Sequence, residues 1–236
     1  MRQRIGLFFL VFFLIGFISC GGKKTSADGN ADPQNKDTNA VKQTSTNTFA
    51  QDTMLSSLKP LLEKGLDKWI QSFPNFHIDS FRQSDIREFQ VNDYREVSGM
   101  GQFYALYQPS LSYSPDSSQF IDLYSSGISL EKKGKKIIAI GDVDQAVTLC
   151  NLKTKSWKSI ISFGPSAGME EVVWISPVKF ILAGTMQNDE GKHQPVLLLG
   201  NTEERSFRWF EANLIRNEAS KYEASGLSKL KIDEWE

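Results

Sequence analysis

The clearest catalytic pattern in the chain lies near its middle. Residues 164–168 have the form G-x-S-x-G, follow an apolar run, and precede Asp189 and His193 in the order serine, acid, histidine. In hydrolases, such a serine sits on a sharp turn between a strand and a helix. Residues 169–175, however, have the apolar and β-branched composition of a strand. We therefore expect a turn between two strands, and a hydrolase using Ser166 and His193 is the alternative hypothesis.

Other groups that could bind a metal or react are few. The chain has two histidines and two cysteines, too few for a disulfide framework or a zinc site made of His and Cys alone. Asp142 and Asp144 supply two carboxylates, whereas calcium takes at least about six oxygen ligands. His77 has no partner motif, and Cys150 lies in an apolar run typical of a buried thiol. We expect no catalytic residue, metal or cofactor site.

Two further features could bind a ligand. Residues 132–136, Lys-Lys-Gly-Lys-Lys, predict a solvated hairpin tip, with contact to anionic headgroups or glycan as the alternative. Trp157, Trp174 and Trp209 fit inward positions of alternating strands, with a sugar-stacking platform as the alternative.

The composition limits the class of protein. The 236 residues are 40% hydrophobic and 23% charged, which suits one globular domain. The 27 Lys and Arg residues nearly balance the 28 Asp and Glu residues, giving a formal charge of −1. Nucleic-acid-binding proteins usually carry a basic face, so we expect no nucleic-acid partner.

One helix must precede the strands. Leucines and aromatic residues between Leu58 and Phe73 recur at three- and four-residue steps, which predicts a helix with one apolar face. We expect Ser57 to be its N-cap, Pro60 to lie in its first turn and Pro74 to end it. A second short helix is predicted over residues 212–222, ended by Gly226.

Between these helices the apolar residues alternate, which predicts short antiparallel strands separated by Gly, Pro, Asn, Asp and Ser. The expected fold is mainly β. The predicted strands are residues 86–91, 103–107, 120–124, 137–140, 147–150, 157–163, 172–175, 180–182, 196–199 and 207–210.

The first twenty residues have the layout of a secretory signal. Arg2 and Arg4 precede the apolar residues 5–18. As a helix, these would span about 21 Å, short of a hydrocarbon core of about 30 Å. Cleavage is therefore the main prediction, and an uncleaved membrane anchor is the alternative.

The end of this run, Phe17-Ile18-Ser19-Cys20-Gly21, resembles the lipobox of bacterial lipoproteins. The resemblance implies cleavage before Cys20, a diacylglycerol thioether on its sulfur, and acylation of the new N-terminus. Gly21 in place of Asp after the cysteine implies, by the same resemblance, an outer-membrane protein facing the periplasm.

The predicted organisation is a signal peptide over residues 1–19, a lipidated cysteine with a disordered tether over 20–48, and one mainly-β domain over 49–236. The tether has no aromatic residue and too little apolar surface to offset its ordering entropy. As a random coil its ends would lie about 30 Å apart.

Two stretches of the domain are similar to each other. Residues 137–160 can be aligned with residues 180–210, with Trp157 and Trp209 in corresponding places. The turns at Tyr113-Ser114-Pro115 and Trp174-Ile175-Ser176-Pro177 resemble those that open blades of TolB-like and WD-type β-propellers. Because a closed propeller needs at least about four blades, we expect blade-like antiparallel meanders forming an incomplete propeller or open stacked sheets.

These patterns together predict a lipid-anchored protein of the bacterial envelope with a β-rich binding or assembly domain. Its expected partners are the membrane, through the lipid on Cys20, and an envelope protein or glycan.

Overall fold

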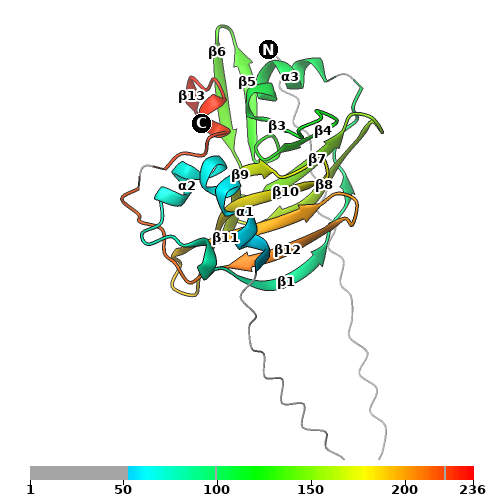
Figure 1. The fold of residues 1–236 in the computed structure, drawn as a ribbon. Helices are drawn as coiled ribbons and strands as arrows, with labels where there is room; N and C mark the ends of the chain where they lie inside the picture. Colours follow the sequence, from blue (N-terminus) through cyan, green and yellow to red (C-terminus); the bar gives the residue numbers. More distant parts are fainter. Residues whose placement is uncertain (1–52, 99, 221) are drawn as a thin grey trace, which may run out of the picture. The chain divides into compact units, whose positions relative to one another are not determined.

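The computed structural model describes residues 53–98, 100–220 and 222–236 (Figure 1). The expected signal peptide, Cys20 and the tether lie outside the described residues. The described chain is mainly β, as expected from the alternating pattern, and none of its helices is long and apolar enough to cross a membrane.

The helical elements are short. The α-helices are α1 (Thr53–Gly65), α2 (Asp67–Gln71) and α3 (Gly101–Tyr107), and the 3₁₀ helices are η1 (Ile78–Ser80), η2 (Gln108–Ser110) and η3 (Leu227–Lys229).

Thirteen strands alternate with these helices and with turns in the described chain. They are β1 (Arg82–Glu88), β2 (Asn92–Asp93), β3 (Ser112–Tyr113), β4 (Gln119–Asp122), β5 (Ile128–Lys133), β6 (Lys136–Gly141), β7 (Gln145–Asn151), β8 (Ser156–Phe163), β9 (Ala167–Trp174), β10 (Lys179–Gln187), β11 (His193–Asn201), β12 (Ser206–Glu211) and β13 (Glu234–Trp235).

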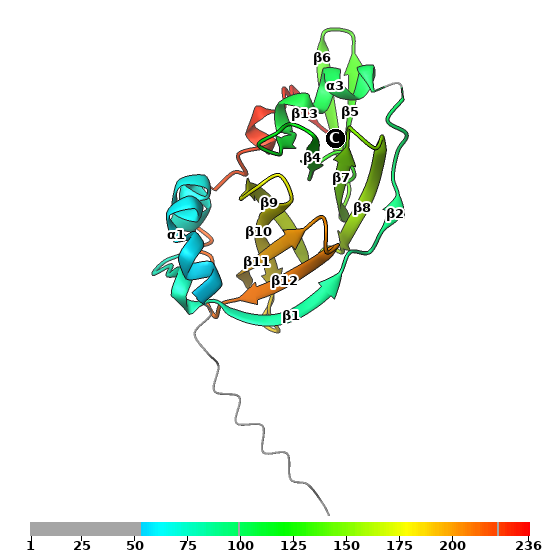
Figure 2. The same ribbon diagram turned by 45° about the vertical axis from the view of Figure 1, so that its right-hand side comes forward.

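These strands form three sheets. Sheet A has the order β1-β12-β11-β10-β9, sheet B has the order β2-β8-β7-β4-β3, and sheet C has the order β13-β6-β5. The chain passes from the edge strand of sheet A to that of sheet B between β1 and β2, so one side of the two sheets is joined by continuous backbone. The β5–β6 hairpin of sheet C projects away from the other two sheets (Figures 1 and 2).

Sheet A is buried on both faces. Phe180 and Leu182 belong to the core shared with sheet B, whereas Ile181 and Ala183 pack with α1 and α2. Figure 2 shows α1 on the side of sheet A away from β7 and β8. Burial on both faces explains the nearly continuous apolar runs of β10 and β11, because alternate residues need not meet water.

Sheet B has α3 on its outer face. Phe103 of α3 packs edge to face with Trp157 of β8, with 4.6 Å between the ring centroids, and its ring is nearly parallel to that of Phe120 of β4. The molecule is therefore layered as α3, sheet B, sheet A, and the α1–α2 pair.

Sheets A and B repeat the same arrangement of four strands. Strands β3, β4, β7 and β8 form one antiparallel meander, and β9, β10, β11 and β12 form the other. In each meander the strand registers place four residues in one row across the strands. Each row has the order aromatic, aromatic, small, aromatic. The rows are Tyr113–Phe120–Cys150–Trp157 and Trp174–Phe180–Gly200–Phe207. The expected equivalence of Trp157 and Trp209 is thus wrong, because Phe207 occupies the position that corresponds to Trp157.

Helix α1 begins earlier than its apolar pattern suggested. It starts at Thr53, so Ser57 is not its N-cap and Pro60 lies inside it. Proline has no backbone N–H to donate there, but packing supports the helix, since Leu55 and Leu62, together with Leu66 directly after it, are buried against sheet A. Each fully buried leucine contributes about 1.5–3 kcal/mol.

Two secondary-structure predictions were wrong. Residues 103–107 form helix α3 instead of a strand, because Phe103 and Tyr107, four positions apart, share the face that covers sheet B. The described part of 212–222 forms no helix. Its backbone bonds to other parts of the chain instead: Arg216 N donates to His193 O at 2.9 Å and Asn217 N to Ser72 O at 3.1 Å.

Candidate functional site

The two meanders meet at a cleft of about 430 Å³, here called the sheet-junction cleft. Its walls come from β4, β7 and β8, from the link between β1 and β2, and from the turns that follow β9 and β11. This size and a mixed lining are typical of small-molecule sites. The apolar lining residues are Phe89, Val91, Leu149, Ile160 and Val178.

Two equivalent turns form the rim of the sheet-junction cleft. Asn151 Oδ1 accepts hydrogen bonds from the backbone N–H groups of residues 153 and 154, and Asn201 Oδ1 accepts them from residues 203 and 204. Each turn then uses a residue with positive φ, Lys155 at 52° and Arg205 at 54°. The Asn side chains stabilise these turns by mimicking a backbone turn, and the sequences N-L-K-T-K-S and N-T-E-E-R-S show the same pattern.

Polar groups line the rim of the cleft, and one of their hydrogen bonds joins the two sheets. Gln119 Nε2 of β4 donates to Pro177 O of the β9–β10 turn at 2.9 Å, whereas Phe89 N donates to Arg205 O at 2.7 Å and so extends the pairing of β1 with β12. Lys158 pairs with Asp93 at 3.0 Å, and Arg205 and Glu203 add further charges. The cleft thus combines an apolar floor with charged and hydrogen-bonding groups at its mouth.

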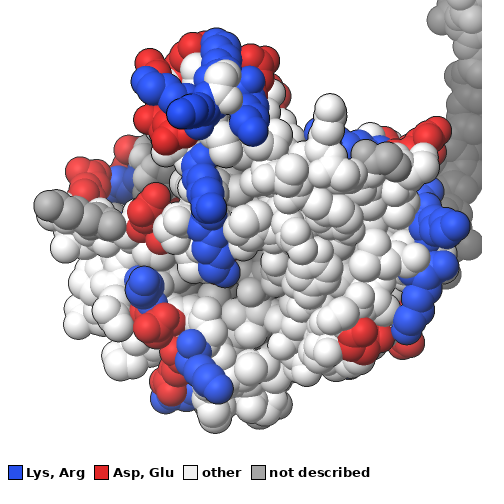
Figure 3. All heavy atoms as spheres, turned by 90° about the horizontal axis from the view of Figure 1, so that it is seen from above, with Lys and Arg blue, Asp and Glu red and all other residues white. Residues whose placement is uncertain are grey.

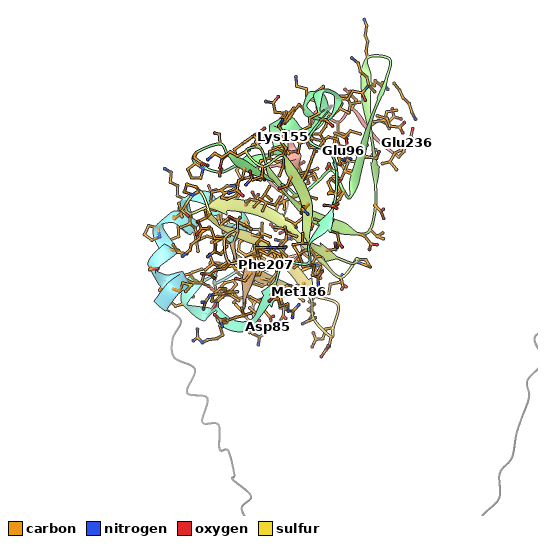
Figure 4. The ribbon with its side chains drawn as sticks, turned by 90° about the vertical axis from the view of Figure 1, so that its right-hand side faces the viewer. Asp85, Glu96, Lys155, Met186, Phe207 and Glu236 are labelled. Atoms are coloured by element: carbon orange, nitrogen blue, oxygen red, sulfur yellow. The ribbon has the colours of Figure 1, made fainter. Side chains whose placement is uncertain are left out.

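A wider groove of about 810 Å³ lies on the α3 side of sheet B, lined by residues 93–98 and 155–158. Figure 4 marks two lining residues of opposite charge, Lys155 and Glu96. The guanidinium of Arg95 lies over the rings of Tyr94 and Phe103, at 5.2 and 5.4 Å from their centroids. Arg95 therefore already covers the aromatic groups that could stack on a ligand here.

A third cleft, of about 310 Å³, lies at the opposite end of the two sheets and is here called the hairpin-base cleft. It brings together Asp142, Asp144 and His193 from the sequence prediction. His193 Nδ1 lies 3.3 Å from Thr185 Oγ1, and Asp142 Oδ1 accepts a hydrogen bond from Val143 N. Among the described residues, no group of three or more His, Cys, Asp or Glu side chains is placed to hold a metal ion.

The structure does not pair Ser166 with His193. Ser166 O accepts a hydrogen bond from Gln187 N at 2.7 Å, and Gln187 is the register partner of His193. Strand β10 thus separates the two backbones, which places them about 10 Å apart, at two strand spacings. The residues after Ser166 form strand β9, as the sequence indicated, and not a helix. The sharp strand-to-helix turn that a catalytic serine needs is therefore absent at Ser166.

The other singled-out residues lie in ordinary structural positions. Trp157 and Trp209 are buried, and Trp174 Nε1 donates to Ser112 O at 3.1 Å, so these tryptophans contribute to the core and not to an exposed stacking platform. His77 is exposed, and its carbonyl accepts a hydrogen bond that closes η1. Residues 132–136 form the tip of the β5–β6 hairpin, with Gly134 at φ 68°.

Sequence reasoning missed a carboxylate pair on β9. Glu170 is an extra residue at a bulge, where it accepts two hydrogen bonds from the Arg216 guanidinium, both at 2.6 Å, and one from Trp69 Nε1 at 2.8 Å. Neighbouring strand residues point to opposite faces. Two carboxylates within an apolar strand are the only sequence signal for this pair.

The second carboxylate, Glu171, is buried and holds the segment after β12 to sheet A. It accepts hydrogen bonds from Tyr222 OH at 2.7 Å, from Ser225 N at 2.6 Å and from Ser225 Oγ. Burial and donation to this carboxylate raise the pKa of Tyr222 well above its usual value. Glu170 and Glu171 therefore have a structural role, and we call them the β9 clasp.

Cys150 is a buried free thiol whose chemistry can be tested directly. Burial raises its pKa from 9.0 to about 12. In a Cys20→Ser chain, we expect Cys150 to react with a disulfide reagent near pH 8 about 10³-fold more slowly than in guanidinium chloride, since only the thiolate attacks.

This raised pKa also makes stability depend on pH. Below pH 9 the thiol is neutral in both the folded and the unfolded chain, so burying it costs no proton uptake. As the pH rises from 9.0 to about 12, the thiol of the unfolded chain ionises while that of the folded chain stays protonated, so the free energy of unfolding falls across this range. If the disulfide reagent labelled Cys150 in the native chain as fast as in the unfolded chain, the buried position of the thiol would be contradicted.

Comparison of the chain with protein-family models, with curated proteins and with solved structures finds no match.

Proposed function

We propose that this chain is a lipid-anchored protein of the bacterial envelope that holds a mainly-β ligand-binding domain near the membrane. The anchor is the lipid on Cys20, the tether is residues 20–48, and the membrane is the outer membrane, with the domain facing the periplasm. The sheet-junction cleft is the binding site, and the observation that carries this assignment is its apolar floor beneath a charged rim.

The anchor is supported by the lipobox-like residues around Cys20 and by the energetics of acyl chains. Each buried methylene contributes about 0.8 kcal/mol, and stable attachment needs more than one chain. A diacylglycerol thioether with an N-terminal acyl group supplies three.

A fatty-acid labelling experiment tests the anchor. We expect radiolabelled palmitate to be incorporated into the full chain, which should fractionate with membranes, while Cys20→Ser should lose both the label and the membrane association. Cys150→Ser is the matched control, because it removes the other cysteine and should keep both. An unlabelled wild-type chain, or a labelled Cys20→Ser chain, would refute lipidation at Cys20.

The domain is a pair of stacked blade-like units. Each meander has four strands. The aromatic row of sheet B faces α3, and the aromatic row of sheet A faces sheet B. In a propeller, successive blades are also stacked so that their corresponding faces point the same way along the stack. The helices α3 and α1–α2 then cover the two faces where further blades would stack.

The lining of the sheet-junction cleft favours an amphipathic envelope component with an apolar body and a polar or anionic end. Leu149, Ile160 and Val178 would contact the body, and Arg205 and Lys158 would contact the anionic end. An apolar floor supplies affinity, and a few polar groups fix orientation.

A fluorescent amphipathic anion, 8-anilinonaphthalene-1-sulfonate, tests the cleft. We expect saturable binding to the native chain and about tenfold weaker binding, or about 1.4 kcal/mol, for Arg205→Glu. Lys68→Glu is the matched control, because it makes the same charge change on α2, on the opposite face of sheet A. Equal effects of the two substitutions would contradict binding at the cleft.

A further inference from the structure

The β5–β6 hairpin presents two backbone edges, and the structure closes one of them with a side chain. Tyr107 OH donates to Ile128 O at 2.7 Å and accepts from Leu130 N at 2.9 Å. One hydroxyl thus satisfies two groups that a neighbouring strand would otherwise pair. The part of the β5 edge nearest α3 is therefore closed, and within the described residues it is the β6 edge that pairs with a further strand.

The β6 edge binds a short extended segment of the same chain. Strand β13 pairs with it in parallel, with Glu234 opposite Ile138 and Trp235 opposite Ala139. Three hydrogen bonds to the edge frame this pairing: Asp233 N to Ile137 O and Glu236 N to Ala139 O, both at 2.9 Å, and Ile137 N to Asp233 Oδ2 at 2.7 Å. Such main-chain pairing is how sheet edges recognise extended peptides.

Two lysines of the hairpin form ion pairs with the acidic side chains of β13 and the residue after it. Lys133 lies 3.0 Å from Glu236, and Lys136 lies 3.3 Å from Glu234. Within the described residues, Lys132 and Lys135 at the same tip form no ion pair, so the edge keeps unpaired positive charge. Figure 3 looks down on this projection, where basic and acidic side chains are intermixed, and Figure 4 marks Glu236 beside the hairpin.

The opposite face of the added strand carries an aromatic ring. Trp235 Cζ3 lies 3.9 Å from where a Cβ of Gly141 would be, which is an ordinary van der Waals distance, so the indole lies beside Gly141 at the end of β6. The segment bound at this edge therefore presents two acidic residues separated by an aromatic one. Glu234 and Glu236 point to the lysines, and Trp235 points to the other face.

The resident segment covers this edge incompletely. Strand β13 has two residues where β6 has six, and Trp235 remains 54% exposed. Its ion pairs are exposed, and such pairs stabilise little. Nearby, Val143 is 71% exposed and Ile140 is 38% exposed, so a longer strand would bury apolar surface that β13 leaves in water.

We propose that the β6 edge is a docking site for an extended acidic segment of a partner protein, which pairs with Ile137, Ala139 and Gly141 and displaces residues 233–236. The resident segment shows the recognised chemistry, and the lysines provide the charge complementarity. This inference is independent of the anchor and of the sheet-junction cleft.

The test uses the pentapeptide Ile-Asp-Glu-Trp-Glu as the probe, with Ile-Asn-Gln-Trp-Gln as its neutral control. The protein is the ¹⁵N-labelled Cys20→Ser chain lacking residues 233–236, studied by NMR. We expect saturable shifts of the Ile137, Ala139 and Gly141 amides, at least fivefold weaker binding of the neutral peptide, and weaker binding of the acidic peptide to the chain that retains residues 233–236.

A second variant protects the test against misfolding of the shortened chain. In the chain with Glu234→Lys and Glu236→Lys, the length is kept but the segment is repelled by Lys133 and Lys136, so the acidic peptide should again bind at β6. Shifts absent from β6 in both variants, or equal affinity for the two peptides, would overturn the proposal.

Discussion

Gly184→Ala should destabilise the domain by about 3 kcal/mol or more. A Cβ at Gly184 would lie 2.0 Å from the Gly168 carbonyl oxygen and 2.8 Å from Met169 Cα. Both atoms belong to the backbone of β9, next to the bulge whose extra residue, Glu170, accepts hydrogen bonds from Arg216. The clash cannot be relieved by rotating a side chain, so sheet A must distort or β9 must move. Urea unfolding followed by circular dichroism measures the loss.

Gly101→Ala is the control for this prediction. It lies at the start of α3, and an added Cβ there would meet no atom within 4 Å. We expect unchanged or slightly greater stability, because alanine favours the helix over glycine by up to about 1 kcal/mol. If the two variants unfolded at the same urea concentration, the tight approach of β9 and β10 at Gly184 would be wrong.

Glu171→Gln should also cost about 3 kcal/mol. The buried carboxylate accepts hydrogen bonds from Tyr222 OH, Ser225 N and Ser225 Oγ. Glutamine replaces one of the two acceptor oxygens by an NH₂ group, which cannot accept these hydrogen bonds and would face the donor groups instead. Leaving buried donors unsatisfied costs about 1–3 kcal/mol each, and more when the lost partner is charged. Thermal unfolding reports the loss, and amide exchange should accelerate first in the segment around Ser225.

Glu223→Gln is the matched control in the same segment. Glu223 is exposed, and an exposed substitution of this kind changes stability by at most about 0.5 kcal/mol. Normal exchange protection around Ser225 in Glu171→Gln would show that the β9 clasp does not hold this segment.

The success and failure of the sequence predictions have local causes. Strands β7, β8, β10, β11 and β12 were predicted, because alternating or continuous apolar residues and turn-forming Asn fix them locally. Strand β5 was missed because its sequence, I-S-L-E-K-K, ends in charged residues, which are tolerated only because the hairpin projects into water. Residues 103–107 suit both a strand and a helix, and the fit of Phe103 to Trp157 decided between them.

The candidate sites show the same limit. The sequence singled out Asp142, Asp144 and His193, and the structure places all three at one cleft, yet nothing in their spacing indicated a shared location. The sheet-junction cleft uses equivalent turns that are visible in the sequence only as two N-x-x-x-[KR]-S stretches. Their convergence depends on which sheets stack, which is a property of the whole chain.

By itself, the sequence determined the mainly-β class, the amphipathic helix, the turn residues, and the expectation of a lipid on Cys20, because local periodicity and short motifs encode these. Only the tertiary structure decided the layering of the two meanders, the β9 clasp, the clefts and the partly covered β6 edge. These features join residues far apart in the chain, such as Trp69 with Glu170 and Lys133 with Glu236, and long-range contacts of this kind leave no regular spacing in a single sequence.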